Sequence, residues 1–195
     1  MAVLTLHPWP GALPPLQQGV VLICTRHPAG AGRAEARAQI REALRAVISQ
    51  TLGLPPSALS FPHVPGQAPR VLITGRHEPG LSISHEDDIS VAALHLYGPV
   101  GIDLMRVRDI PDWESVARDY LGPQTTLGLR QVAQEQRAQA FAQAWCLREA
   151  TLKCAGRALE EWSGEPEADY RRFGLDLPPG LVGMLVLPVT PGRSH

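Results

Sequence analysis

The sequence GPVGIDLM (residues 98–105) divides the chain into two halves of similar make-up. Its Gly-Pro start breaks the chain, and residues 100–107 then resume as a predicted strand. Because side chains alternate along a strand, one face is apolar and the opposite face carries Asp103. The apolar face consists of Val100, Ile102 and Leu104, and the other face consists of Gly101, Asp103 and Met105. We expect an N-terminal lobe of residues 1–98 and a C-terminal lobe of residues 99–195.

The first half is predicted to run strand, helix, then strands. Residues 19–25 form a short β-branched run that is typical of a strand. Residues 34–52 carry apolar side chains at helical spacing, and Gly53 ends that helix. Further strands are expected at 71–74, 81–85 and 89–96, the last two joined as a hairpin by Glu86-Asp87-Asp88.

The second half repeats this order after residues 100–107. A short helix is predicted over 113–121, a long helix over 130–155, and a strand pair over 170–177 and 181–189. The similar order of elements favours a mixed α+β fold of two related lobes, although no sequence repeat supports it.

Composition excludes several classes of protein. With 44% hydrophobic residues, 19% charged residues and a net charge of −1, the 195-residue chain is typical of a globular protein without the basic excess that binds nucleic acid. No apolar run approaches the ~20 residues of a membrane helix. The three cysteines lack metal-site spacing, which favours a reducing compartment. We therefore expect a cytoplasmic protein that does not bind membranes or nucleic acid.

Asp103 is the first candidate site residue. An acid flanked by glycine and apolar residues costs much free energy to bury unless a cation or hydrogen-bond donors satisfy it. A metal ligand meets this requirement. An Asp that caps a strand end or pairs with an arginine meets it too, so the strand pattern leaves both roles open.

The long helix contains FAQAWCLREATLK (residues 141–153), in which Phe141, Trp145, Glu149 and Lys153 recur every four residues. They lie on one stripe of a helix, and its aromatic part should face the core. A surface Glu–Lys pair at this spacing contributes only about 0.2–0.5 kcal/mol. A carboxylate and an ammonium at the edge of a buried stripe favour a cleft over open solvent.

Ser84-His85, at the end of a predicted strand, is a weaker candidate. These side chains can hydrogen-bond phosphate oxygens, but a single histidine is more often structural. The sequence lacks the GxGxxG and GxxxxGK[ST] phosphate loops, the GxSxG nucleophile turn and the HExxH zinc motif.

Taken in order, these segments resemble the Sfp-type 4′-phosphopantetheinyl transferase superfamily over residues 66–159. The matching segments are Gly66-Gln-Ala-Pro69, Ser84-His85, Val100-Gly-Ile-Asp103, Ser115–Leu121 and Trp145-Cys-Leu-Arg-Glu-Ala-Thr-Leu-Lys153, which continues to Leu159. Each motif is modest alone, but their order and spacing together are specific.

The resemblance implies a pseudo-twofold α+β fold of two lobes, each a small antiparallel sheet packed on a long helix, with coenzyme A in the cleft between them. It implies an enzyme, a holo-[acyl-carrier-protein] synthase. The 4′-phosphopantetheine arm of coenzyme A moves to a serine of an apo acyl or peptidyl carrier protein, and adenosine 3′,5′-bisphosphate is released. Mg²⁺ is the usual metal, and we expect a monomer.

The resemblance also assigns roles to residues. Asp103 and Glu149 are the implied metal ligands, and Glu149 is also the candidate acceptor of the carrier serine's proton. Lys153 neutralises the diphosphate, and Ser84 and His85 hold phosphate oxygens of coenzyme A. The basic residue that binds the 3′-phosphate aligns poorly, and the candidates are Arg70, Arg26 and Arg33.

Two positions depart from the family pattern. Many members carry a second acid where this chain has Met105, and Arg148 replaces the usual lysine before Glu149. Met105 motivates one alternative, a catalytically degenerate module that binds coenzyme A or docks a carrier. A purely structural domain is the other alternative, and it predicts that Asp103 and Glu149 lie far apart. The sequence does not identify the carrier or the pathway.

Overall fold

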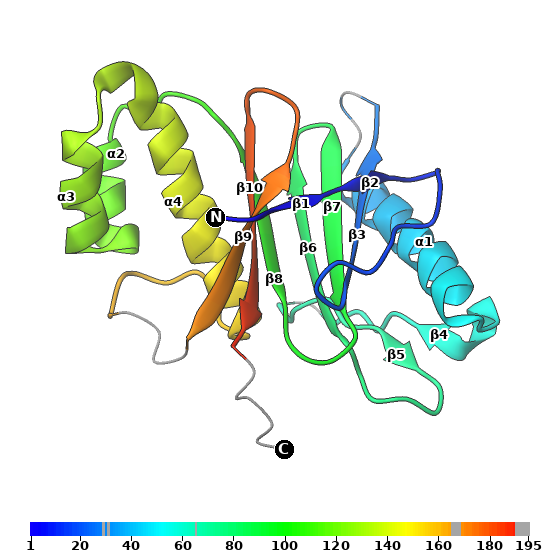
Figure 1. Ribbon diagram of the computed structural model, residues 1–195. Coiled ribbons are helices and arrows are strands. Elements are labelled where there is room, and N and C mark those ends of the chain that lie inside the picture. The colour runs from blue at the N-terminus through cyan, green and yellow to red at the C-terminus, as the bar shows by residue number, and fades with distance from the viewer. Residues whose placement is uncertain (29, 31, 65, 165–168, 190–195) are drawn as a thin grey trace.

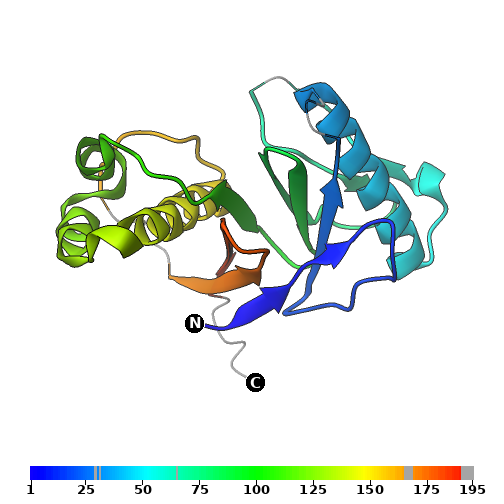
Figure 2. The same cartoon turned by 90° about the horizontal axis from the view of Figure 1, so that it is seen from above.

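The computed structural model describes the chain except for residues 29, 31, 65, 165–168 and 190–195. The described residues form two four-stranded sheets, one two-stranded sheet and four α-helices. The two larger sheets lie between two long helices, one on each outer side (Figures 1 and 2). The prediction of a mixed α+β fold is therefore confirmed.

The first large sheet has the strand order β2-β3-β7-β6. Its strands are β2 (His7–Pro8), β3 (Val20–Arg26), β6 (Gly80–Glu86) and β7 (Ile89–His95). Helix α1 (Arg33–Leu52) packs on one face through buried residues that include Ile40, Leu44 and Ile48. It ends at Gly53, whose left-handed backbone (φ 63°) lets its N–H bond the Ser49 carbonyl, as the sequence predicts.

The second large sheet has the order β1-β9-β10-β8 and packs on helix α4 (Gln134–Cys154). Its strands are β1 (Val3–Thr5), β8 (Gly101–Arg106), β9 (Tyr170–Asp176) and β10 (Leu181–Pro188). A Cβ at Gly101 would lie 1.8 Å from the Ala150 carbonyl oxygen, so only glycine allows β8 to approach α4 this closely.

The faces turned away from the helices share one core between the two sheets. Val20, Val91 and Leu185 belong to it, together with the predicted apolar face of residues 100–104. The alternation along β8 is therefore confirmed, because Val100, Ile102 and Leu104 join this core while Asp103 points toward α4.

Shorter elements complete the fold. They are the 3₁₀ helix Pro56–Ala58, β4 (Leu59–Ser60), β5 (Leu72–Ile73), α2 (Trp113–Val116), the π-helical turn Ala117–Leu121 and α3 (Pro123–Gln131). The predicted start of the long helix at residue 130 is wrong, because Val132 and Ala133 adopt extended backbone angles that separate α3 from α4. Within the described residues, no helix combines the length and hydropathy needed to cross a membrane.

The N-terminal residues link the two sheets. β1 pairs in parallel with β9 of the second sheet, while β2 pairs in parallel with β3 of the first. Neither strand was predicted, since each is only two or three residues long. The lobe division at residues 98 and 99, and a pseudo-twofold relation between the lobes, stay predictions.

Candidate functional site

Strands β6 and β8 lie side by side where the two sheets meet (Figure 1). Side chains of β6 join the two strands. Every second residue of β6 accepts a hydrogen bond from a backbone N–H of β8. The three bonds are Ile102 N to Ser82 Oγ (3.0 Å), Leu104 N to Ser84 Oγ (3.4 Å) and Arg106 N to Glu86 Oε1 (3.1 Å). We call these three bonds the β6–β8 ladder. It brings Ser84 next to Asp103.

Asp103 is almost fully buried, with 6% of its surface exposed. Its Oδ1 accepts a 2.6 Å hydrogen bond from Lys153 Nζ and a 2.7 Å hydrogen bond from the Ser84 hydroxyl. Lys153 Nζ also donates to the Ile102 carbonyl at 3.3 Å. Lys153 of α4 and Ser84 of β6 thus supply the hydrogen-bond donors that a buried carboxylate requires.

Glu149 lies on the other side of the same ammonium group, with Oε2 3.9 Å from Lys153 Nζ. Burial raises the pKa of Glu149, Asp103 raises it further, and Lys153 opposes both. Asp103 and Glu149 are therefore close together and share a lysine. This geometry contradicts the purely structural alternative, in which the two acids lie far apart and pair with arginines.

The predicted stripe on α4 is present, and its two ends differ in environment. Phe141 and Trp145 stack with their ring centroids 6.0 Å apart and pack in an apolar cluster. Trp145, Glu149 and Lys153 then line a cavity. The stripe therefore runs from the core to a cleft, as the residue types predict.

This cavity has a volume of about 630 Å³. It brings together the predicted site residues Ser84, His85, Asp103, Glu149 and Lys153, with Met105 beside them, but neither Arg26 nor Arg70. Three arginines, Arg33, Arg37 and Arg108, add positive charge to its lining. A polyanionic ligand of small size therefore fits both the volume and the charge.

A second cavity of about 550 Å³ adjoins the first and shares Arg37 and His85 with it. The segment Gly66–Pro69 lines this second cavity, together with Arg41 and His63. The two cavities are therefore neighbours along α1 and the end of β6.

His85 stands where the two cavities meet. Its Nδ1 lies 2.7 Å from the Ser90 hydroxyl, which is also 3.2 Å from His27 Nε2. Burial lowers the pKa of His85 to about 4, and the nearby charges of Arg37 and Lys153 contribute. His85 is thus neutral at physiological pH while the cavity holds no anion.

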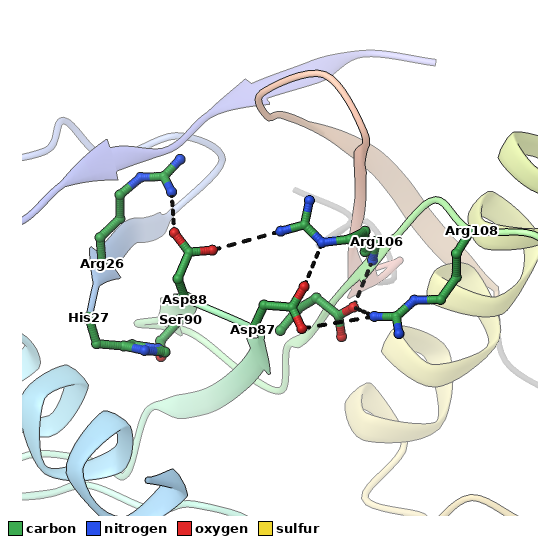
Figure 3. A network of polar contacts seen from close by, with 8 residues as sticks. Arg26, His27, Asp87, Asp88, Ser90, Arg106 and Arg108 are labelled. Atoms are coloured by element: carbon green, nitrogen blue, oxygen red, sulfur yellow. Dashed lines mark hydrogen bonds and ion pairs between the residues drawn. The ribbon is translucent and has the colours of Figure 1, made fainter. Parts of the chain in front are cut away.

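Arg26 and Arg70 are engaged elsewhere. Arg70 forms two hydrogen bonds with Glu78, at 2.7 and 2.6 Å, and lies outside the lining of both cavities. Arg26 pairs with Asp88 in the network at the turn between β6 and β7 (Figure 3). Of the three arginines proposed from the sequence, only Arg33 lines the large cavity.

The same network extends to the cavity rim. Arg106 pairs with Asp87, and Arg108 pairs with Glu86 at 2.5 Å (Figure 3). These ion pairs connect the turn after β6 to the end of β8. They continue the β6–β8 ladder outward and fix the ends of both strands that carry site residues.

Comparison with known proteins identifies a domain within the chain. Residues 99–174, which contain β8, α4, Asp103, Glu149 and Lys153, match the sequence model of the 4′-phosphopantetheinyl transferase superfamily. The chain carries a domain of this superfamily. The resemblance found from the motifs is thereby confirmed.

Two relatives support the assignment of the superfamily. The chain is 28% identical over 120 residues to a putative 4′-phosphopantetheinyl transferase of Synechocystis and 30% identical over 121 residues to the 4′-phosphopantetheinyl transferase HetI of Nostoc. The matches cover 62% and 61% of this chain, and 49% and 51% of the relatives. The chain thus spans about half the length of the curated relatives it matches.

Asp103 and Glu149 are the residues of this cavity that could hold a divalent metal such as Mg²⁺. Mg²⁺ is commonly held by one or two carboxylates, with waters and substrate phosphates completing its shell. Asp103 and Glu149 could supply two such carboxylates, since both line the cavity beside Lys153. Among the described residues, no group of three or more His, Cys, Asp or Glu side chains is placed to hold a metal.

Sequence reasoning missed two cations that line the cavity, Arg37 and Arg108. Arg37 is one of several arginines on α1, and only the packing of that helix shows that it lines the cavity together with Arg33. Arg108 follows β8 by two residues, and its position depends on its pairing with Glu86. Neither residue stands in a recognisable motif.

Proposed function

We propose that this protein is a Mg²⁺-dependent 4′-phosphopantetheinyl transferase, of the holo-[acyl-carrier-protein] synthase type, that uses coenzyme A. One observation carries the proposal. Asp103, Glu149 and Lys153 meet at one cavity, within hydrogen-bond or ion-pair distance of the lysine, in a domain of this superfamily.

The proposed reaction joins the hydroxyl oxygen of a carrier serine to the phosphorus that bears the pantetheine arm. The bond from that phosphorus to the bridging oxygen breaks, and adenosine 3′,5′-bisphosphate leaves with the bridging oxygen. Such transfers depend mainly on positioning and on neutralising charge at the phosphate oxygens. No nucleophile of the enzyme is required. This agrees with Cys146, whose pKa is raised by burial and by Asp103, so that its thiol stays neutral.

Lys153 is the proposed point charge for the diphosphate, because an ammonium has three donors, and Asp103 and the Ile102 carbonyl accept two of them. Arg33 and Arg37 line the same cavity and add charge for the remaining phosphate. His85 is proposed to contact a phosphate oxygen. Arg70 is another of the candidates for the 3′-phosphate, but it pairs with Glu78, so the cavity lining supports Arg33 and Arg37 more strongly.

Glu149 is proposed to accept the proton of the carrier serine, directly or through a water. A raised pKa suits this role, since a stronger base takes a proton more readily. Mg²⁺ held by Asp103 and Glu149 would supply charge neutralisation at the diphosphate. In this proposal the two lobes, residues 1–98 and 99–195, both contribute to the cleft, so a monomer holds the whole site.

A degenerate module that binds coenzyme A or docks a carrier is the second candidate, and Met105 favours it. A thioether is a poor ligand for Mg²⁺. Met105 therefore supplies no metal ligand at the position where many family members carry a second acid. This candidate predicts metal-independent binding of coenzyme A without transfer.

Incubation of the protein with coenzyme A, Mg²⁺ and several apo carrier proteins tests the proposal. Mass spectrometry should show a gain of one phosphopantetheine on a carrier serine. Glu149→Gln should abolish this gain, whereas Glu135→Gln, which removes an exposed carboxylate from the first turn of the same helix, should leave it unchanged. Absence of transfer to every carrier by the folded protein would contradict the proposal.

A further inference from the structure

Ser84 makes two hydrogen bonds with β8. Its hydroxyl donates to Asp103 Oδ1 at 2.7 Å, and its oxygen accepts from the Leu104 N–H at 3.4 Å. Ser84 and Asp103 are each only 6% exposed. A hydroxyl carries one proton, so the donor capacity of Ser84 is committed to Asp103.

Ser82 occupies the equivalent position one step earlier on the β6–β8 ladder. Its oxygen accepts from the Ile102 N–H at 3.0 Å, and the residue is 3% exposed. The β8 residue that corresponds to Asp103 at this step is Gly101, which has no side chain. The two serines therefore share a structural role, and Ser84 alone also contacts an acid.

The contact with Asp103 joins groups from two different sheets, because Ser84 lies on β6 and Asp103 on β8. Lys153 of α4 bonds the same oxygen at 2.6 Å. Two donors on one oxygen hold a carboxylate in one orientation. Hydrogen bonds of this kind, made to a metal-ligating carboxylate, commonly change metal affinity by about 10–100-fold.

We infer that Ser84 is a positioning residue, whose hydroxyl orients the carboxylate of Asp103 for a divalent cation. The inference rests on the proposed function, which makes Asp103 a metal ligand. It gives Ser84 a role different from the phosphate contact that the sequence motif implies. A phosphate contact would require the hydroxyl to release Asp103, whereas the positioning role uses the bond already present.

Two affinities separate these roles. The affinity for coenzyme A is measured in metal-free buffer by isothermal titration calorimetry. The affinity for Mn²⁺ is measured at a fixed coenzyme A concentration from the electron paramagnetic resonance signal of free Mn²⁺, with coenzyme A alone as the blank. A positioning residue affects the second affinity and leaves the first unchanged, whereas a phosphate contact weakens the first.

Ser84→Ala should weaken Mn²⁺ binding about 10–100-fold, as expected for loss of a partner of a ligating carboxylate. Ser84→Cys keeps the volume but has a weak donor, so it should also weaken Mn²⁺ binding. Ser84→Thr keeps the hydroxyl and should bind Mn²⁺ nearly as the wild type does. Ser82→Ala removes the matching ladder bond and should leave both affinities unchanged.

Equal Mn²⁺ affinities of wild type and Ser84→Ala would overturn the inference. So would equal losses in Ser84→Ala and Ser82→Ala, which would assign the effect to the ladder. If Ser84→Ala fails to fold, the Mn²⁺ affinities of Ser84→Cys and Ser84→Thr are compared instead. Equal affinities of these two variants would overturn the inference. An Asp103→Ala variant that binds Mn²⁺ as tightly as the wild type would also overturn the inference.

The carrier-transfer assay keeps the two proposals apart. Transfer by the wild type together with normal Mn²⁺ binding by Ser84→Ala would refute the positioning role alone. Absence of transfer by the wild type would refute the proposed function, whatever the Ser84 variants do.

Discussion

Lys153 Nζ lies 2.6 Å from Asp103 Oδ1 and 3.9 Å from Glu149 Oε2, so one ammonium serves two acids. The acids come from β8 and α4, which glycine at position 101 allows to pack closely. Two carboxylates with one ammonium leave a net negative charge in a partly buried place. In the proposed function, that imbalance is the physical basis for binding a divalent cation.

Replacing Lys153 with Met should destabilise the metal-free protein and make its stability depend on Mg²⁺. The change leaves the buried Asp103 with one donor fewer, at a cost of about 1–3 kcal/mol in the free energy of unfolding. Added Mg²⁺ should recover part of that loss, because it binds the folded state. Urea denaturation with and without Mg²⁺ measures both effects.

Arg130→Met is the control for Lys153→Met, because it breaks an exposed ion pair with Glu114. It should leave both the stability and its response to Mg²⁺ nearly unchanged. A Lys153→Met protein as stable as the wild type in metal-free buffer would contradict the charge imbalance described above.

Glu149→Gln should stabilise the fold near neutral pH while abolishing transfer. The pKa of Glu149 is raised above its ordinary value, so the folded state holds this proton more tightly than the unfolded state does. The free energy of unfolding therefore falls as pH rises from the pKa of Glu149 in the unfolded state to its higher pKa in the folded state. Above this interval, ionised Glu149 destabilises the fold. Glu149→Gln has no ionisable group at this position, so this destabilisation is absent.

Thermal melting of wild type and Glu149→Gln over a series of pH values measures this effect. The variant should have the higher melting temperature at about pH 7, and the difference should shrink in acid, where Glu149 of the wild type is protonated. A difference that stays constant with pH would show that packing, not charge, causes it.

His85 should make the fold sensitive to mild acid. Its pKa is lowered to about 4 from an ordinary value of 6.5, so the unfolded state binds a proton more readily between these values. Stability is then lost as pH falls from 6.5 toward 4, by about 1.4 kcal/mol for each unit of pKa difference. His85→Gln should lose less stability over the same interval in urea denaturation. An unchanged pH dependence would contradict the shifted pKa.

The sequence predicts the site better than it predicts the connections between elements. Asp103 was assigned to the face opposite the apolar residues because strand alternation is strict, and that face does meet α4. Glu149 and Lys153 were placed together because helical spacing fixes neighbours at four residues. Both patterns are local, so they can be recognised without knowing the packing.

Contacts between distant segments were not predictable in this way. The parallel pairing of β1 with β9 joins residues more than 160 positions apart, and nothing in three residues of strand encodes the partner. The break between α3 and α4 lies at Val132 and Ala133, which have no glycine or proline to mark it. Tertiary packing overrides local propensity there.

Met105→Glu should strengthen metal binding. Met105 lines the cavity two residues after Asp103 on the same face of β8, so a glutamate there adds a hard oxygen ligand near the two acids. Mn²⁺ affinity, measured from the resonance signal of free Mn²⁺ with coenzyme A present, should rise. Met105→Gln, which has similar length and no charge, is the control. Equal affinities of the Glu and Gln variants would show that position 105 does not reach the cation.

Gly101→Ala should disrupt both the fold and the site, because it separates β8 from α4. The new Cβ would lie 1.8 Å from the Ala150 carbonyl oxygen and 2.7 Å from the Cys154 nitrogen, and backbone atoms cannot rotate aside. Such overpacking costs about 1–3 kcal/mol or more in the free energy of unfolding. The displacement also moves Lys153 away from Asp103, so transfer should fall even where the variant remains folded.

Gly128→Ala is the matched control, since Gly128 lies inside α3 and a Cβ there meets no atom within 4 Å. Alanine in a helix interior is favoured over glycine by about 0.5–1 kcal/mol, so this variant should be slightly more stable and fully active. Urea denaturation should show a loss of stability for Gly101→Ala and a small gain for Gly128→Ala, and carrier transfer should fall in Gly101→Ala alone. A Gly101→Ala protein with wild-type stability and transfer would show that β8 and α4 tolerate separation, and that the shared lysine does not depend on their close contact.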